Sequence, residues 1–259
     1  MRPGDQGGVG GGISLEDQVD ATIDDCTFRS NTCNSYGGAF YIYEYCSVDI
    51  TNCSFEGNGV PYTTADGEGD DGEVWDTADG GALYVQDYAV VTVTSSSFTG
   101  NESTSDGGAI DTDTRATIIL IDCDFTGNRT GQDGGAVCVS GALLDATDCT
   151  FTSNEVTSVD GSSDGGGAIH AYLGDSYMPY NGLALTNCTF TGNQSGDEGG
   201  AMSLDEFVDM MSEPPPPKPQ KAADDDDSDD GDDEAEMAAA AKTASKTALG
   251  SWRRKQSDV

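Results

Sequence analysis

A small set of carboxylate, guanidinium and imidazole side chains in this sequence could do chemistry. Asp111, Asp113 and Arg115 alternate along one short segment, and His170 is the single histidine. Carboxylates in such a group could hold Ca²⁺ or protonate a glycosidic oxygen, with Arg115 as a base or substrate clamp. The four residues therefore define a candidate carbohydrate-active site. The alternative is that they are solvated side chains on an exposed face.

These residues lie within a repeat of two alternating motifs. The first motif is GGA followed by an apolar residue; it occurs six times and is preceded by a degenerate GGGI at 10–13. The second motif, Phe-x-x-Asn, begins at Phe28, Phe55, Phe98, Phe125, Phe151 and Phe190. The interval from Gly80 to Phe98 recurs in three other copies, and so does the interval from Phe98 to Gly107. Together they give a base period of about 27 residues, which indicates a stacked repeat protein.

Short alternating apolar runs within each period predict β-strands. Apolar residues occupy the third and fifth positions after the first glycine, as in Leu83 and Val85, and a second pair precedes each Phe, as in Val91 and Val93. Runs this short with a period of two are strands rather than helices. Three strands and three turns in each period predict a triangular coil. The fold class is therefore all-β, a parallel β-helix solenoid of about seven coils stacked at about 4.8 Å.

Three recurring residue types then acquire structural roles. The Phe residues are expected to form an interior stack, and the Asn residues a ladder at a corner with amides bonding along the axis. Glycine pairs are expected where a Cβ has no room. Five cysteines share the slot two residues before Phe: Cys26, Cys53, Cys123, Cys149 and Cys188. We favour a column of buried free thiols there and leave disulfides between neighbouring coils open.

The strand after each glycine pair should also present an outer face. Its outward positions form two columns, with Tyr41, Tyr84, Asp111, Cys138 and His170 in one and Tyr43, Gln86, Asp113, Ser140 and Tyr172 in the other. His170 then lies two coils, or about 10 Å, from Asp111. The tyrosines would suit stacking on sugars or contact with protein. The candidate binding residues are Tyr41, Tyr84, Asp111, Asp113, Arg115, His170 and Tyr172.

The alternation of GGA[I/L/V] with FxxN resembles the repeat of the polymorphic outer membrane proteins. The resemblance covers about residues 7–204. It implies a right-handed β-helix of the pectin-lyase-like class and a surface-displayed or secreted protein with an adhesin-like role. The chain departs from the bacterial members in having no C-terminal membrane barrel, which puts autotransport and membrane anchoring in question.

Composition narrows the function classes. Lys and Arg number 11 against 47 Asp and Glu, for a formal net charge of -36, which argues against nucleic acid as a partner. The sequence has no run of 18 apolar residues and no signal-peptide core near Met1, so we expect no transmembrane segment in this chain. Because the repeat begins within about a dozen residues of Met1, we expect a fragment of a larger protein.

An enzyme is the weaker functional expectation. The repeat region carries only Arg2, Arg29, Arg115 and Arg129 as cationic side chains, whereas a lyase needs several to neutralise uronate carboxylates. The outward neighbours of Asp111 are Tyr84 and Cys138 rather than a second carboxylate, which a hydrolase would need. We therefore expect no catalytic residues and an extracellular or cell-surface scaffold with a glycan or surface protein as ligand. The alternative is a polysaccharide lyase or glycoside hydrolase.

No cofactor is expected apart from weak Ca²⁺ binding. Asp79, Asp106, Asp133 and Glu198 precede glycine pairs and could stack as an acidic ladder, and the insertion 65–76 clusters oxygen ligands. We expect the solenoid over 7–204, with loop insertions near 59–79, 155–165 and 174–181. A proline-rich and acidic disordered tail is expected over 205–259.

Overall fold

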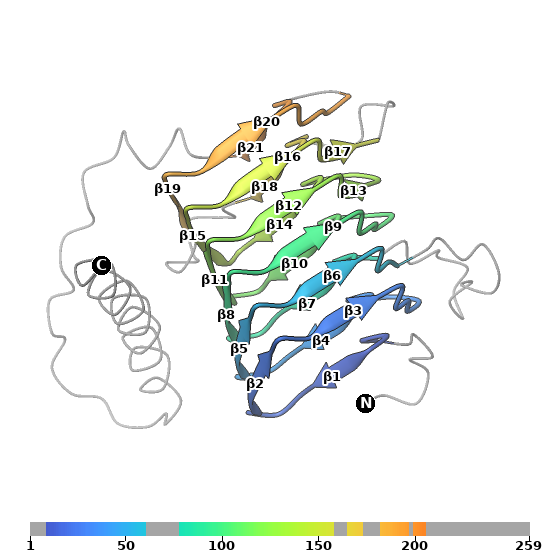
Figure 1. Ribbon diagram of the computed structural model, residues 1–259, viewed down its shortest axis with the longest axis vertical. Helices are drawn as coiled ribbons and strands as arrows, with labels where there is room; N and C mark the ends of the chain where they lie inside the picture. The colour runs from blue at the N-terminus through green and yellow to red at the C-terminus, as the bar shows by residue number, and fades with distance from the viewer. Residues whose placement is uncertain (1–8, 61–77, 158–164, 173–181, 197–198, 206–259) are drawn as a thin grey trace, which may run out of the picture. The chain divides into compact units, whose positions relative to one another are not determined.

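The computed structural model describes residues 9–60, 78–157, 165–172, 182–196 and 199–205. Its strands form three long parallel sheets that run side by side along one axis (Figure 1), and a fourth sheet of two strands. The first sheet holds seven strands, so the predicted seven coils are confirmed. In order they are β1 (Ile13–Leu15), β4 (Phe40–Ile42), β7 (Leu83–Val85), β10 (Ile110–Asp113), β14 (Val137–Ser140), β18 (Ile169–Tyr172) and β21 (Met202–Asp205).

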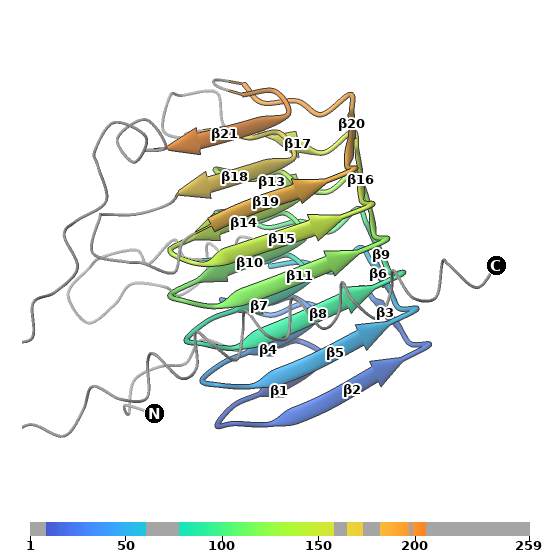
Figure 2. The ribbon, with the colours of Figure 1, turned by 90° about the vertical axis from the view of Figure 1, so that its left-hand side faces the viewer.

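The second and third sheets hold six strands each, in the same coil order (Figure 2). The second contains β2 (Asp20–Asp24), β5 (Ser47–Thr51), β8 (Val90–Thr94), β11 (Thr117–Ile121), β15 (Leu143–Thr147) and β19 (Gly182–Thr186). The third contains β3 (Thr27–Arg29), β6 (Ser54–Glu56), β9 (Ser97–Thr99), β12 (Asp124–Thr126), β16 (Thr150–Thr152) and β20 (Thr189–Thr191). Every ladder is parallel and in register, as in Phe98 with Phe125, so each coil repeats the coil below it.

Two strand ends differ by one or two residues from the predicted boundaries. Glu155 and Val156 form a short strand, β17, which pairs with β13 (Arg129–Thr130), although a loop insertion was expected from 155. The pairing arises because backbone groups of neighbouring coils meet at this turn, which apolar alternation does not reveal. Asp205 ends β21 rather than opening the tail. The predicted tail from 206 onward and the predicted insertions at 61–77, 158–164 and 174–181 lie outside the described residues.

The interior holds the predicted phenylalanine stack. Ring centroids of successive Phe residues are 4.7 Å apart for Phe55 with Phe98 and for Phe98 with Phe125, with nearly parallel planes. These three rings are fully buried together with the apolar residues of all three sheets. Burying one such aromatic side chain stabilises the fold by about 2–3 kcal/mol. The stack therefore makes the interior one continuous core along the axis.

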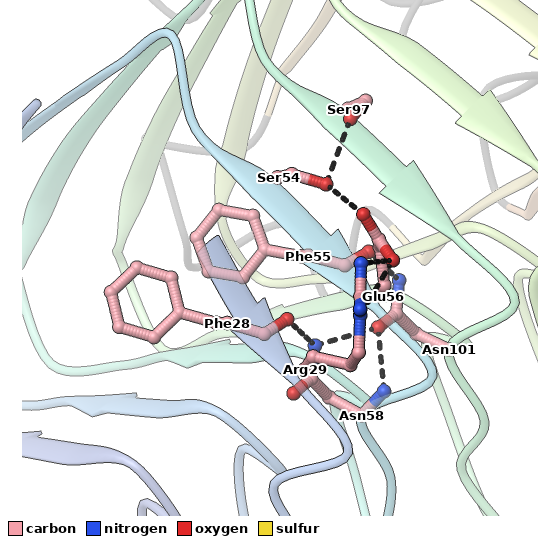
Figure 3. A network of polar contacts seen from close by, with 8 residues as sticks. All are labelled: Phe28, Arg29, Ser54, Phe55, Glu56, Asn58, Ser97 and Asn101. Carbon is pink, nitrogen blue, oxygen red and sulfur yellow. Dashed lines mark hydrogen bonds and ion pairs between the residues drawn. The ribbon is translucent and has the colours of Figure 1, made fainter. Parts of the chain in front are cut away.

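The predicted asparagine ladder closes the corner after the third sheet (Figure 3). The Asn101 Oδ1 atom accepts hydrogen bonds from the backbone N–H and from Nδ2 of Asn58, both at 3.0 Å. Asn58 Nδ2 also donates to the Phe28 carbonyl oxygen of the coil below at 3.0 Å. The same pattern continues through Asn128 and Asn154. The amides thus bond the backbone groups that a sharp bend leaves without strand partners.

The glycine pairs are required by close packing between coils. A Cβ on Gly108 would lie 2.2 Å from the Gly135 carbonyl oxygen and 2.7 Å from the Arg129 nitrogen. Its neighbour Gly107 has a φ of 59°, which only glycine adopts without strain. This confirms the expectation that the pair stands where a Cβ has no room.

The cysteine column points into the core, and its thiols are free. Cys53, Cys123 and Cys149 are buried, while Cys26 and Cys188 in the outer coils are half-buried. Cys53 and Cys123 each donate to the carbonyl of the residue two positions before. The thiols therefore pack as small apolar groups with local hydrogen bonds.

Candidate functional site

The outer face of the first sheet differs from the predicted solvated surface. Tyr84 alternates with the core residues Leu83 and Val85, so its predicted side of the strand is correct. However, Tyr84, Asp111, Cys138 and His170 are only 4%, 5%, 1% and 2% exposed. The expectation of solvated side chains was wrong for this column. Strand alternation determines the side of the sheet on which a residue lies, but not whether that side faces water.

The strand register brings three chemically distinct groups into one buried column. Asp111 pairs with Cys138, and Cys138 pairs with His170, on three successive coils. His170 is thus two coils from Asp111, as predicted. Burial, with the Asp111 charge as the next cause, raises the pKa of the Cys138 thiol well above its usual value. Because the thiolate is the nucleophile, this environment does not activate Cys138.

An acidic ladder runs beside this column, as the aspartates before the glycine pairs predicted. The Asp79 Oδ1 atom accepts the backbone N–H of Asp106 at 3.3 Å, and Asp106 Oδ1 accepts that of Asp133 at 3.1 Å. Asp133 Oδ1 accepts the N–H of Gly165 at 3.1 Å. Each carboxylate therefore bonds the backbone of the next coil. Glu198, the fourth predicted member, lies outside the described residues.

Burial makes the protonated form of these carboxyls favourable. It raises the pKa of Asp79 to about 6, and burial with the neighbouring Asp79 and Asp133 charges raises the pKa of Asp106 to about 8. Burial, followed by the Asp79 and Asp106 charges, raises the pKa of Asp111 well above its usual value. The Asp111 Oδ1 atom is buried and accepts no hydrogen bond within the described residues. Protonation of these aspartates removes the repulsion between their stacked charges. From the sequence, bound cations were expected to do this.

Asp113 and Arg115 leave the column at the turn after β10. Asp113 Oδ1 accepts the backbone N–H of Thr114 at 2.6 Å. The Arg115 guanidinium lies 5.2 Å from the Tyr88 ring centre, and its Nη1 donates to the Tyr88 hydroxyl. Tyr172, at the end of β18, is 41% exposed. The seven predicted residues therefore do not converge on one cleft.

Two tyrosines outside the predicted set form a stacked pair at a turn of the solenoid. Tyr45 and Tyr88 stack with ring centres 4.9 Å apart and planes within 7°, and Tyr45 is 37% exposed. Their φ angles are 60° and 61°, in the left-handed region that bulky residues rarely adopt. Together with Arg115, at a φ of 63°, they form the corner column. All three stand at the same offset from the first glycine of their coil, and this shared offset could have revealed them.

A second tyrosine group adjoins the corner column. Tyr41 stacks on Tyr84 at 5.9 Å with planes 1° apart, and on Tyr43 at 5.8 Å. A hydrogen bond to Asp87, with the Asp87 charge, raises the pKa of Tyr43. Aromatic faces beside carboxylates can stack on a sugar ring while accepting hydrogen bonds from its hydroxyls. Of the predicted candidates, Tyr41 and Tyr84 stack on each other, and Asp111 and His170 continue the same column on later coils.

Two further expectations concern metal and membrane. Within the described ranges, no group of three or more His, Cys, Asp or Glu side chains is arranged to hold a metal ion. The acidic insertion at 65–76 lies outside those ranges, and weak Ca²⁺ binding stays a prediction. None of the described segments forms a helix long and apolar enough to cross a membrane.

Comparison with known proteins gives one match. The family model described as a right-handed β-helix region matches residues 6–201. No curated protein and no solved structure matches the chain. The matched range begins before β1 and ends just before β21, so it covers every described strand except β21.

Proposed function

The chain belongs to the right-handed β-helix family, and from this premise we propose that it is a non-enzymatic scaffold that binds a glycan. The location proposed is outside the cell or at its surface. Support for this location is the repeat, which resembles that of the polymorphic outer membrane proteins, with their adhesin-like role. The acidic composition, with a net charge of -36, suits a neutral or cationic ligand and disfavours an anionic one.

The corner column carries the proposal. Gln18 and Arg115 share the left-handed backbone of Tyr45 and Tyr88 at this offset, so the turn itself imposes it, and the proposal rests on the stacked tyrosine rings placed there. The two rings stack on each other, and the Arg115 guanidinium lies over the Tyr88 ring, so Tyr45 supplies the exposed aromatic surface of the column. A sugar ring can pack its apolar C–H groups against the exposed part of the Tyr45 ring. The nearby Tyr43 and Asp87 could bond the hydroxyl groups of the same ligand.

Glycan-array binding tests this proposal, with Tyr45→Ala as the perturbing variant and Tyr172→Ala as the matched control. Both tyrosines are more than a third exposed, but Tyr172 is on another coil and away from the corner column. Loss of one stacking aromatic should weaken binding about tenfold for Tyr45→Ala and leave Tyr172→Ala unchanged. Circular dichroism establishes that both variants fold. If the protein binds no glycan, or if both variants bind alike, the glycan site is rejected and a structural role remains.

A polysaccharide-active enzyme is the second candidate, and one observation favours it. A general acid needs a carboxyl group with a raised pKa, and burial supplies one at Asp106 and another at Asp111. The burial that raises these pKa values also keeps Asp111 from a polymeric substrate, so the binding scaffold is preferred. Incubation with a panel of polysaccharides, with and without Ca²⁺, distinguishes the two. Depolymerisation that is lost in Asp111→Asn would replace the scaffold proposal.

A further inference from the structure

The cysteine column in the core stacks its thiols from coil to coil. Each of its cysteines stands directly before a strand of the third sheet. Backbone hydrogen bonds join these positions in register: the Ser54 N–H donates to the Cys26 oxygen, and the Thr189 N–H to the Cys149 oxygen, both at 2.9 Å. Neighbouring positions of the column are therefore one strand spacing, about 4.8 Å, apart, which lies within the range of Cα separations that a disulfide spans.

The thiols of neighbouring coils already contact each other. The Cys149 thiol shares hydrogen bonds with the thiols of Cys123 and Cys188, on the coils to either side. The Cys53 thiol lies against Cys26 and is in contact with its backbone. Thiols in such contact need only a small further approach of their sulfur atoms to form a disulfide.

Ser96 divides the column into two groups. It occupies the cysteine slot of its own coil, is buried, and accepts the Cys53 backbone N–H at its hydroxyl at 3.0 Å. A hydroxyl cannot form a disulfide, so no bridge can cross this coil. The column therefore consists of a pair, Cys26 and Cys53, and a trio, Cys123, Cys149 and Cys188. Any bridge within the trio has to include its middle member, Cys149.

The three cysteines outside the column have no such neighbour. On the adjacent described coils, the positions equivalent to theirs hold other residue types. These are Val60 for Cys33, Val19 and Ala89 for Cys46, and Asp111 and His170 for Cys138. The register of the solenoid thus separates five cysteines that can be bridged from three that cannot.

We propose that in an oxidising environment this chain forms two disulfides between neighbouring coils, Cys26–Cys53 and a second one from Cys149 to another member of the trio. The oxidant is a small disulfide such as oxidised glutathione. One cysteine thiolate attacks this disulfide, which forms a mixed disulfide and releases one glutathione thiolate. The neighbouring cysteine thiolate then attacks the protein sulfur of the mixed disulfide and releases the second glutathione. Two protein thiols are thereby oxidised for each glutathione disulfide reduced.

The folded core slows this reaction. The hydrogen bond to Cys123, together with burial, raises the pKa of the Cys149 thiol to about 12, and burial raises the pKa of the Cys53 thiol. Because the thiolate is the nucleophile, the bridges form while the chain folds rather than afterwards. The experiment therefore refolds the full chain from urea in a buffer of reduced and oxidised glutathione.

Thiol titration and peptide mapping of the refolded chain test the proposal. Each bridge consumes two thiols, so the free thiols should fall from eight to four. Mapping should find a Cys26–Cys53 linked peptide and should find Cys33, Cys46 and Cys138 still free. The bridged protein should melt about 5–10 °C above the same protein kept reduced, because the unfolded chain is constrained.

Substitutions in the cysteine slot provide matched variants, and Ser96 shows that the slot accepts serine. Cys149→Ser removes the middle of the trio and should reduce the thiols consumed from four to two, whereas Cys123→Ser should leave four consumed. Ser96→Cys completes a column of six cysteines and should raise the thiols consumed to six. Circular dichroism of each reduced variant establishes that it folds. Refolded protein that keeps all its thiols, bridges to cysteines outside the column, or equal thiol loss in Cys149→Ser and Cys123→Ser would overturn the proposal.

Discussion

Replacing Asn154 by alanine measures what the asparagine ladder contributes to stability. The Asn154 Oδ1 atom accepts from the backbone N–H and Nδ2 of Asn128 at 3.0 and 2.9 Å, and its Nδ2 donates to the Phe125 oxygen at 3.1 Å and to Asn193. Asn154 is fully buried. The variant leaves the Asn128 N–H without an acceptor in the core, while the Phe125 oxygen keeps its place in the ladder between β12 and β16. One orphaned group costs about 1–3 kcal/mol, and with the lost amide bonds the free energy of unfolding should fall by about 2–4 kcal/mol.

Asn31→Ala is the matched control for this measurement. Asn31 occupies the same corner, and its side-chain amide donates to Asn58 Oδ1. After the substitution, Asn58 Oδ1 still accepts from the backbone N–H of residue 31. Its removal orphans no buried group and should cost about 1 kcal/mol. Urea unfolding of protein made in bacteria, where no glycan is attached, gives both values. If Asn154→Ala costs no more than Asn31→Ala, the ladder is not satisfying buried backbone groups, and the reasoning fails.

Two further predictions concern the acidic ladder and the glycines. Because burial raises the folded-state pKa of Asp79 to about 6 and of Asp106 to about 8, their stabilising contribution is full below about pH 4 and is lost as the pH rises through 6 and 8. Melting temperatures should therefore fall over this range, and Asp106→Asn should flatten the slope while the exposed Asp49→Asn leaves it intact. Gly108→Ser should prevent folding, because its Cβ would meet backbone at 2.2 Å. Gly127→Ser should cost only about 1–2 kcal/mol, because nothing lies within 4 Å of its Cβ and the cost is the strain of a φ of 62°. Soluble yield and thermal melts test both.

The repeat made the coil predictable in detail. The recurring motifs place Phe98 over Phe55 and Asn101 over Asn58 even though an insertion lengthens this coil to 43 residues, because parallel stacking preserves register. The same regularity predicted the inward cysteines and the glycine pairs. These are properties of the coil's path, which the alternation of apolar residues encodes locally.

The burial of the candidate site residues could not be predicted from the alternation of apolar and polar residues along each strand. Asp111 and His170 lie on the predicted side of their strands, yet both are buried, because alternation along a strand does not encode whether a face of the sheet meets water. Tyr45 and Tyr88 were overlooked because their left-handed turn is disfavoured for aromatic residues, and only comparison of offsets between coils would have suggested it.

The parallel register has a mechanical consequence. Strands run across the solenoid axis, so the hydrogen bonds between coils lie along it, and tension applied between the two ends loads these bonds in series. Such a chain peels from an end, one coil at a time, rather than resisting as a whole. Each event would release about 27 residues, or roughly 90 Å of extended chain. The molecule would thus act as an extensible tether that yields in equal steps at low force.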